Sequence, residues 1–348
     1  MYKAKEMKEL RKIWLLLAVS IVSVLILAGC GTKSQEDVTG ALKEKVSEMT
    51  GYKANAKMTL QTGAEPQVYE VEIWHKKPTF YRVNLKNSEK DQNQMIIRND
   101  EGVFVLTPAL NKSFRFQSDW PKNSSQAYLY ESLVNDIIND PEATFTATED
   151  GYVFETKTNY QNNKLLPMQE ITLGKDYTPV SVKVLDPDRR VLVLVEFSDV
   201  EFNSKFDDDS FNVEKNMTSM RLDEELPTMG AVNEESKSFS VFYPEDTPAG
   251  TELKDEQEIA TETGKRVIMT YEGDKSFTLV QETAYVAPVS TVSFMSGEPV
   301  DLGFTVGALT ENTITWTLNG VDYMLASNDL SKDEMLMVAR SVQGQVIK

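Results

Sequence analysis

The strongest constraint on the fold of this chain is a series of short segments in which apolar and polar residues alternate. Residues 68–74 alternate strictly, and residues 80–85 return after a turn with Tyr81, Val83 and Leu85 on one face. A period of two is typical of a half-buried antiparallel strand. Further strands are expected at 52–60, 95–98, 103–106, 113–117, 143–148, 152–158, 167–174, 179–185 and 191–202. Short turns join them, so the pattern predicts a meander.

Two amphipathic helices accompany these strands. Apolar residues recur at helical spacing between Val38 and Met49, ahead of the first strand. A second apolar stripe runs from Leu129 to Ile137 and stops before Asp140-Pro141, where a helix would end. An open sheet with one apolar face has to cover that face, so we expect helices to pack against it.

The sequence pattern in the last third of the chain predicts a second, smaller α+β domain at 237–348. It follows a polar stretch, 216–236, which has no periodicity and is interpreted as a linker. Asn319-Gly320 is a strong hairpin signal, and Ser331 with Glu334 forms a capping box that opens a C-terminal helix. The strands expected here are 239–244, 266–271, 276–281, 301–307, 313–318 and 322–327.

The N-terminus predicts a lipid-anchored protein. Five basic residues precede an apolar run, Ile13–Leu27, which is shorter than the roughly 20 residues of a membrane span and suits a signal peptide. The run ends in Leu27-Ala28-Gly29-Cys30, which resembles the bacterial lipobox. We expect residues 1–29 to be a lipoprotein signal peptide, Cys30 to carry a diacylglyceryl group, and residues 30–36 to be a lipidated tether. The alternative is an ordinary signal anchor with a chance cysteine.

Composition narrows the possible functions. The chain of 348 residues has one Cys and one His, which excludes internal disulfides and leaves little from which to build a Cys–His or Ser–His–Asp site. Its net charge of −18 makes nucleic acid a poor partner. Removal of the signal peptide takes away five basic and two acidic residues and leaves −21. An acidic body is repelled by anionic headgroups, so the lipid on Cys30 would have to hold the protein at the membrane.

The order of elements in residues 37–215 resembles the LolA/LppX-like lipoprotein carriers and localisation factors. The resemblance rests on the N-terminal helix, the hairpin turning at Lys77-Pro78, the stretch 99–108, and the closing segment 200–211. It implies an incomplete antiparallel β-barrel covered by helices, whose apolar interior takes acyl chains. Together with the lipobox and the second domain, the chain is most similar to sporulation lipoproteins of endospore formers, the YdcC type. The two-domain arrangement is also similar to RseB-type regulators.

The alternating strands and the second helix supply candidates for the lining of that cavity. They are Val71, Ile73, Val83, Leu85, Met95, Ile97, Val105, Leu133 and Ile137. In the Gram-negative carriers an Arg before the matching Pro bonds to the covering helices and closes the cavity. Lys77 occupies that position here and is the candidate for a cavity-closing contact, although an ammonium group lacks the planar fork of a guanidinium. The alternative is that these residues form a filled core.

These observations predict a protein without enzymatic activity, cofactor or metal, since His75 is expected in an exposed turn and no phosphate-binding loop is present. The favoured hypothesis is a lipoprotein on the outer face of the cytoplasmic membrane that binds lipid or lipoprotein acyl chains, in envelope or sporulation processes. The alternative is a regulatory or scaffold lipoprotein that binds another envelope or sporulation protein and has no functional lipid cavity.

Overall fold

The structure is a computed structural model of the chain. It describes residues 33–342 except 62–65, 88–91, 123–124, 161–165, 226–238, 263, 286–290, 296 and 303–304. The chain divides into two compact units, Met1–Ala41 and Leu42–Lys348. Of the first unit the described part is residues 33–41, which include the start of helix α2 (Gln35–Glu48). Everything below concerns the second unit. No helix within the described ranges is both long enough and apolar enough to cross a membrane.

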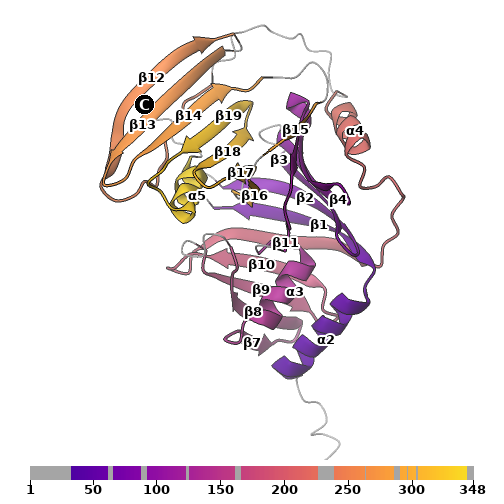
Figure 1. The fold of residues 1–348 in the computed structure, drawn as a ribbon. Coiled ribbons are helices and arrows are strands. Elements are labelled where there is room, and N and C mark those ends of the chain that lie inside the picture. The colour runs from indigo at the N-terminus through magenta and orange to yellow at the C-terminus, as the bar shows by residue number, and fades with distance from the viewer. Residues whose placement is uncertain are drawn as a thin grey trace, which may run out of the picture. The chain divides into compact units, whose positions relative to one another are not determined.

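The larger sheet is open and almost entirely antiparallel (Figure 1). Within the described residues its strand order is β15-β6-β5-β4-β3-β2-β1-β11-β10-β9-β8-β7, and only the pair β15–β6 is parallel. The edge strands β15 and β7 do not meet, which confirms the predicted incomplete antiparallel barrel. The strands are β1 (Gly51–Leu60), β2 (Gln67–Lys76), β3 (Phe80–Asn87), β4 (Gln92–Asn99), β5 (Gly102–Thr107), β6 (Lys112–Phe116), β7 (Thr144–Ala147), β8 (Gly151–Lys157), β9 (Met168–Gly174), β10 (Pro179–Leu185), β11 (Val191–Phe202) and β15 (Thr291–Phe294).

The register of the strands defines two faces. Ile73 is opposite Val83, Val83 opposite Ile96, and Ile96 opposite Val105, so these residues share one face, which we call the inner face. Helix α3 (Tyr130–Asn139) packs on the inner face, where the Gln169 side chain of β9 bonds to it. The predicted second helix is therefore present and covers part of the sheet.

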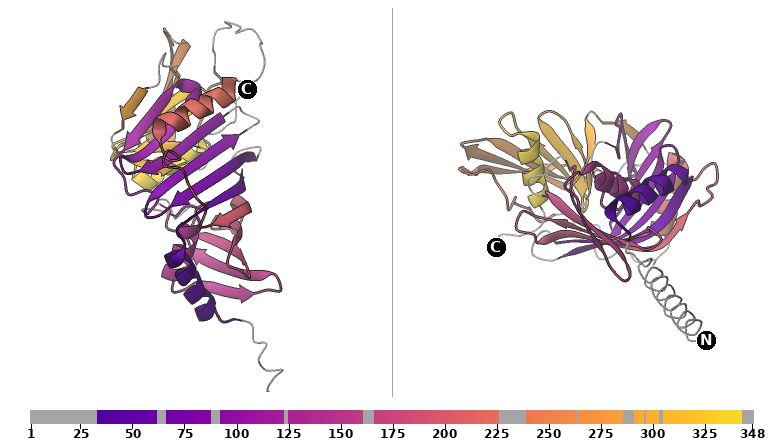
Figure 2. Two further views of the ribbon diagram at one scale, coloured as in Figure 1. Left: turned by 90° about the vertical axis from the view of Figure 1, so that its right-hand side faces the viewer. Right: turned by 90° about the horizontal axis from the view of Figure 1, so that it is seen from below.

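The opposite, outer face is covered by helix α4 (Val213–Glu225), which the sequence interpretation missed (Figure 2, left). Residues 216–225 had been expected to belong to a linker without structure. Asn212 Oδ1 accepts a hydrogen bond from Lys215 N at the start of the helix, and Met217 and Met220 are buried against Phe104 and Leu106. The helix forms because the outer face of β4 and β5 is as apolar as the inner one and has to be covered.

The smaller sheet has the strand order β12-β13-β14-β19-β18-β17-β16 within the described residues and carries helix α5 (Lys332–Ser341). Its capping box is confirmed, because Ser331 Oγ accepts from Glu334 N and Glu334 Oε2 accepts from Ser331 N. Asn319 and Gly320 turn the last hairpin with φ of 53° and 72°. The strands are β12 (Thr251–Thr261), β13 (Gly264–Gly273), β14 (Phe277–Thr283), β16 (Glu298–Asp301), β17 (Val306–Leu309), β18 (Thr313–Leu318) and β19 (Val321–Ala326).

Three details of this region differ from the sequence-based expectation. Residues 239–244 are not a strand, because the backbone of Phe242 bonds to the Gln281 side chain instead of to a neighbouring strand. The strand expected at 301–307 is instead a hairpin of β16 and β17. Strand β12 was not expected at all, since its residues are polar on both faces. In addition β15, from the range assigned to the second domain, pairs with β6 of the first sheet.

Candidate functional site

The predicted cavity-lining residues are all buried, but the structure does not bring all nine together. Val71, Ile73, Val83, Leu85 and Val105 lie on the inner face, and Leu133 and Ile137 lie on α3. Met95 and Ile97 instead lie on the outer face under α4. Their register opposite Leu106 and Phe104 puts them there, since β4 and β5 are buried on both faces and alternation cannot tell which side is the inner one.

Two cavities border the inner face, one on each side of the β16–β17 hairpin. Gln94 Oε1 on β4 accepts hydrogen bonds from Val306 N at 3.0 Å and from Thr305 Oγ1 at 3.2 Å, which fixes the hairpin to the larger sheet. Val306 lines one cavity and Leu302 the other. Of the nine predicted lining residues only Val105 borders either of these two cavities. The remaining inner-face candidates pack as core between them.

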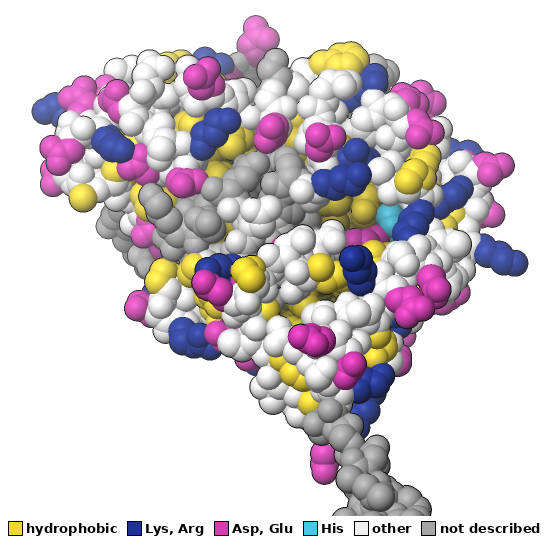
Figure 3. Space-filling view, turned by 60° about the horizontal axis from the view of Figure 1, so that its bottom comes forward, with side chains coloured by type: hydrophobic (Ala, Val, Ile, Leu, Met, Phe, Trp, Pro, Cys, Tyr) yellow, Lys and Arg dark blue, Asp and Glu magenta, His cyan; other side chains and the backbone are white. Residues whose placement is uncertain are grey.

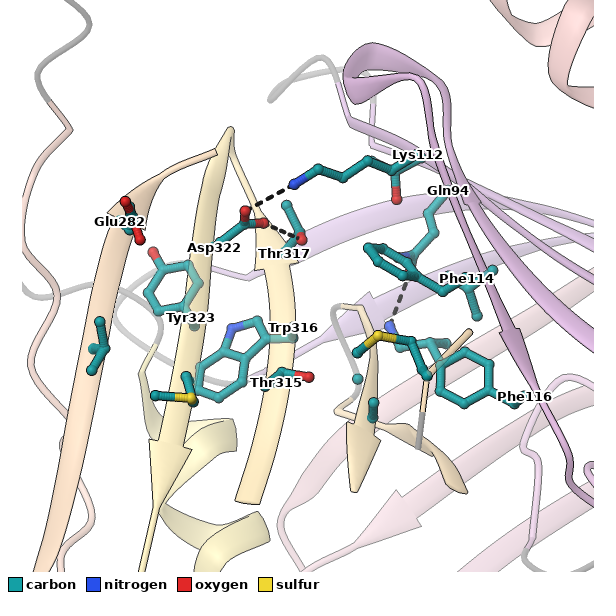
Figure 4. A pocket seen from close by; sticks show the side chains of 18 of the residues that line it. Gln94, Lys112, Phe114, Phe116, Glu282, Thr315, Trp316, Thr317, Asp322 and Tyr323 are labelled. Carbon is teal, nitrogen blue, oxygen red and sulfur yellow. Dashed lines mark hydrogen bonds and ion pairs between the residues drawn. The ribbon is translucent and has the colours of Figure 1, made fainter. Parts of the chain in front are cut away.

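The first cavity, which we call the intersheet groove, has a volume of about 580 Å³ and lies between the two sheets (Figure 4). Its wall on the larger sheet includes Phe114 and Phe116 of β6, which share the inner face with Val105. Its wall on the smaller sheet includes Ile268 and Val280, which are half-buried. Both walls are therefore apolar, as expected for a site that takes an apolar ligand.

Charged pairs lie at the rim of the intersheet groove. Lys112 Nζ is 2.8 Å from Asp322 Oδ2, and Thr317 Oγ1 donates to the other oxygen of that carboxylate at 2.6 Å (Figure 4). Arg266 donates to Glu282 Oε2 through Nε and Nη2 at 2.9 and 2.8 Å. The Lys112–Asp322 pair connects β6 of the larger sheet to β19 of the smaller one. Each of these charged groups is paired with one of opposite charge. They lie at the edge of the groove, so only the polar end of a bound amphiphile could contact them.

The second cavity, the α5 cavity, has a volume of about 640 Å³. Met58 and Leu60 of β1 and Val193 of β11 form its floor, and their register places them on the inner face too. Met337 of α5 and Leu302 close the other side. Arg190 and Asp186, which pair at 2.6 Å, lie at its border.

A buried contact between His75 and Glu131 holds the start of α3 to the inner face. His75, predicted to be exposed in a turn, is instead part of β2 and is 1% exposed. Its Nδ1 lies 3.0 Å from Phe80 O, and its Nε2 contacts the Glu131 carboxylate of α3. A carbonyl oxygen only accepts, so Nδ1 is the ring nitrogen that donates to it. The ring stacks on Tyr81 at 4.3 Å between centroids.

The tyrosines around this pair stay neutral. Burial first, and the Glu131 carboxylate second, raise the pKa of Tyr52, Tyr81 and Tyr130 above the ordinary tyrosine value. Farther along α3, burial raises the pKa of Asp136 to about 6, although Gln169 and Ser125 donate hydrogen bonds to its carboxylate at 2.7 and 2.8 Å. The helix is thus attached to the sheet through two ionisable side chains.

Lys77 contacts the other helix. Its Nζ donates to Val46 O at 2.5 Å and to Ser47 O at 2.8 Å, at the C-terminal end of α2. Two carbonyl oxygens at a helix C-terminus suit a point-like ammonium, so the contact does not require the planar fork of an Arg. The Lys77–Pro78 turn therefore joins β2 and β3 to α2, while His75 joins them to α3.

Other predicted site residues lie outside the described residues. These are the lipobox residues Leu27, Ala28 and Gly29 and the predicted lipid attachment site Cys30. In the part of the chain that the structure describes, no group of three or more His, Cys, Asp or Glu side chains could hold a metal ion. On the face shown in Figure 3, Lys and Arg side chains are interspersed with Asp and Glu rather than gathered into a basic patch.

The fold and its cavities define the class of protein. An open antiparallel sheet with few helices, followed by a smaller β-rich part, is the α+β architecture with an incomplete antiparallel barrel that the sequence predicted. Residues 10–211 match the family described as "Sporulation protein YdcC-like". The chain is also 58% identical over 343 residues to "Sporulation protein YdcC" of Bacillus subtilis (strain 168), covering 98% of this chain and 100% of that protein. The chain belongs to the YdcC-like family of sporulation proteins.

Solved structures with similarity to the chain are more distant. A chain of the Pseudomonas aeruginosa MucA/MucB complex is 13% identical, with a TM-score of 0.33 and coverage of 89% of this chain and 99% of that one. A LolA superfamily protein from Nitrosomonas europaea is 12% identical, with a TM-score of 0.29 and coverage of 51% and 98%. A chain of the complex of the Clostridioides difficile CwlD amidase with the GerS lipoprotein is 16% identical, with a TM-score of 0.30 and coverage of 51% and 98%.

Proposed function

We propose that this sporulation protein is a non-enzymatic lipoprotein that binds an acyl chain in the intersheet groove. The observation that supports this most directly is the groove itself, whose two walls are apolar and whose volume of about 580 Å³ is in the usual range for a small-molecule site. The acyl chain of the ligand would lie against Phe114 and Ile268. Its polar end would point toward the Lys112–Asp322 and Arg266–Glu282 pairs.

A fluorescent long-chain fatty acid tests this site. Thr315 of β18 borders the groove, is half-buried and pairs with Met324 of β19 on the same face of the smaller sheet. Thr315→Trp should therefore fill the groove and weaken binding at least about tenfold. Thr278→Trp is the matched control, because Thr278 lies on the same face of the smaller sheet but does not line the groove. Met337→Arg in the α5 cavity should leave binding unchanged. If Met337→Arg abolishes binding and Thr315→Trp does not, the groove is the wrong site.

We further propose that the protein is attached to the outer face of the cytoplasmic membrane through a diacylglyceryl group on Cys30. The support is the lipobox-like sequence Leu27–Cys30 together with the net charge of −18, which gives the protein body no attraction of its own for anionic lipid. Cys30→Ala should move the protein from the membrane fraction to the soluble fraction. Membrane attachment that persists in this variant would contradict the anchor.

A further inference from the structure

Strand β12 (Thr251–Thr261) is the outermost strand of the smaller sheet and contributes almost nothing to its core (Figure 1). Its nine residues from Glu252 to Ala260 are all exposed, whereas an ordinary edge strand buries every second side chain. It is paired with β13 along one side, and no strand among the described residues pairs with its other side. A strand of about 35 Å is thus held mainly by one ladder of backbone hydrogen bonds.

The free side of β12 is acidic on both faces of the sheet. The strand carries Glu252, Asp255, Glu256 and Glu258 against a single Lys254. Their partners on β13 place Glu252 and Asp255 on one face of the sheet and Glu256 and Glu258 on the other. Among the described residues, Glu258 is the one carboxylate of this set with a cationic partner, Lys265 at 3.1 Å.

We propose that β12 binds an extended, basic segment of another protein, which adds to the smaller sheet as an eighth strand. The unpaired backbone groups supply the hydrogen bonds of the added strand, and the carboxylates select positive charge. Because carboxylates lie on both faces, the partner segment carries basic residues at consecutive positions rather than at every second one. A second copy of this chain is disfavoured, since two acidic edges would place like charges opposite each other.

A synthetic peptide of about ten residues, made of Lys, Thr and Val with lysines at consecutive positions, serves as the probe. The full-length protein should bind it, and hydrogen exchange of the β12 amides should slow while exchange elsewhere in the smaller sheet is unchanged. A peptide of the same charge with Pro in place of Val cannot pair as a strand and should bind at least about tenfold more weakly. Equal binding of both peptides, or binding without protection of β12, would overturn the proposal.

A charge reversal on the strand locates the contact. Glu252→Lys with Asp255→Lys should weaken binding of the basic peptide about tenfold, since each reversal replaces an attraction by a repulsion. Glu149→Lys with Asp150→Lys is the matched control, because these residues are exposed in the turn between β7 and β8 and change the net charge equally. Thermal unfolding of both variants verifies that they fold. Equal loss of binding in both variants would show attraction to the whole acidic surface and refute a site at β12.

Discussion

At the scale of single residues, a buried contact between His75 and Glu131 joins α3 to the inner face. His75 and Glu131 have side chains that are 2% and 13% exposed, so both polar groups are largely removed from water. Two buried polar groups in contact compensate each other only while both are present, because either one alone keeps its desolvation cost.

The first prediction concerns this pair. His75→Phe or Glu131→Leu alone should each lower the free energy of unfolding by about 1–3 kcal/mol. The double variant should lose clearly less than the sum of the two, because no buried polar group is left without its partner. Urea denaturation measures all three. The same cycle on Lys157 and Glu142, whose side chains are 59% and 71% exposed, should give a coupling below about 1 kcal/mol. Additive losses at His75 and Glu131 would contradict a direct coupling between the two side chains.

The second prediction concerns Asp136. Burial raises its pKa from 3.8 to about 6, so the folded protein binds this proton more tightly than the unfolded chain does. The stability that this group contributes is therefore complete below about pH 4 and is lost as the pH rises to about 6. The loss amounts to about 3 kcal/mol, at about 1.4 kcal/mol per pKa unit.

Asp136→Asn is neutral at every pH and keeps an oxygen that accepts from Ser125 and Gln169. Urea denaturation between pH 4 and pH 7 should show a smaller decrease in stability for this variant than for the wild-type protein. Asp150→Asn is the control, because Asp150 lies in an exposed turn. This variant should lose as much stability between pH 4 and pH 7 as the wild-type protein. An unchanged slope in Asp136→Asn would show that the carboxyl titrates normally.

At the scale of elements, the β2–β3 hairpin is a common attachment point for two helices. Its Lys77 donates to the last carbonyls of α2, and its His75 contacts α3. Helix ends leave unpaired carbonyl groups, and a cation at that position both pairs them and opposes the negative end of the helix dipole. The hairpin therefore orders the ends of elements that lie far apart in the sequence.

The third prediction tests this attachment. Lys77→Met removes the donor and should speed hydrogen exchange in the last turn of α2 about tenfold, with a loss of about 1–2 kcal/mol in global stability. Lys77→Arg keeps a donor and should retain most of the protection. If the Met variant protects α2 as well as the wild-type protein does, the two carbonyl contacts do not hold the helix end.

At the scale of the second unit, three specific contacts among the described residues join the two sheets. Gln94 bonds to the β16–β17 hairpin, Lys112 pairs with Asp322, and β15 adds to the edge of the larger sheet. These contacts set the width of the intersheet groove, because both of its walls depend on them. Binding at this groove and docking of the two sheets are therefore coupled.

The fourth prediction follows from that coupling. Gln94→Leu with Lys112→Met should remove contacts worth about 2 kcal/mol, at about 1 kcal/mol each, and separate the unfolding of the two sheets into two calorimetric transitions. Arg189→Met is the control for charge, because its partner Glu155 belongs to the same sheet. A single unchanged transition in the double variant would show that the sheets dock through other contacts.

Most of the strands could be predicted from the sequence, because half-buried strands alternate between apolar and polar residues. The alternation at 68–74 and 80–85 encodes strands directly, because one face is buried and the other is not. Helix α4 and strand β12 were missed because neither has a strong apolar periodicity. Met217 and Met220 alone give α4 a weak apolar face. Strand β12 buries neither face, so its apolar and polar residues do not alternate.

The sequence by itself determined the open antiparallel sheet and the α3 and α5 helices, because local periodicity and capping residues carry that information. The family followed from a resemblance in the order of its motifs. Only the tertiary structure decided which face each apolar residue occupies. It placed Met95 and Ile97 under α4, buried His75 against Glu131, and formed a groove from residues as far apart in the sequence as Gln94 and Met324. The reason is that strand register and sheet docking depend on contacts between distant segments, which no local pattern records.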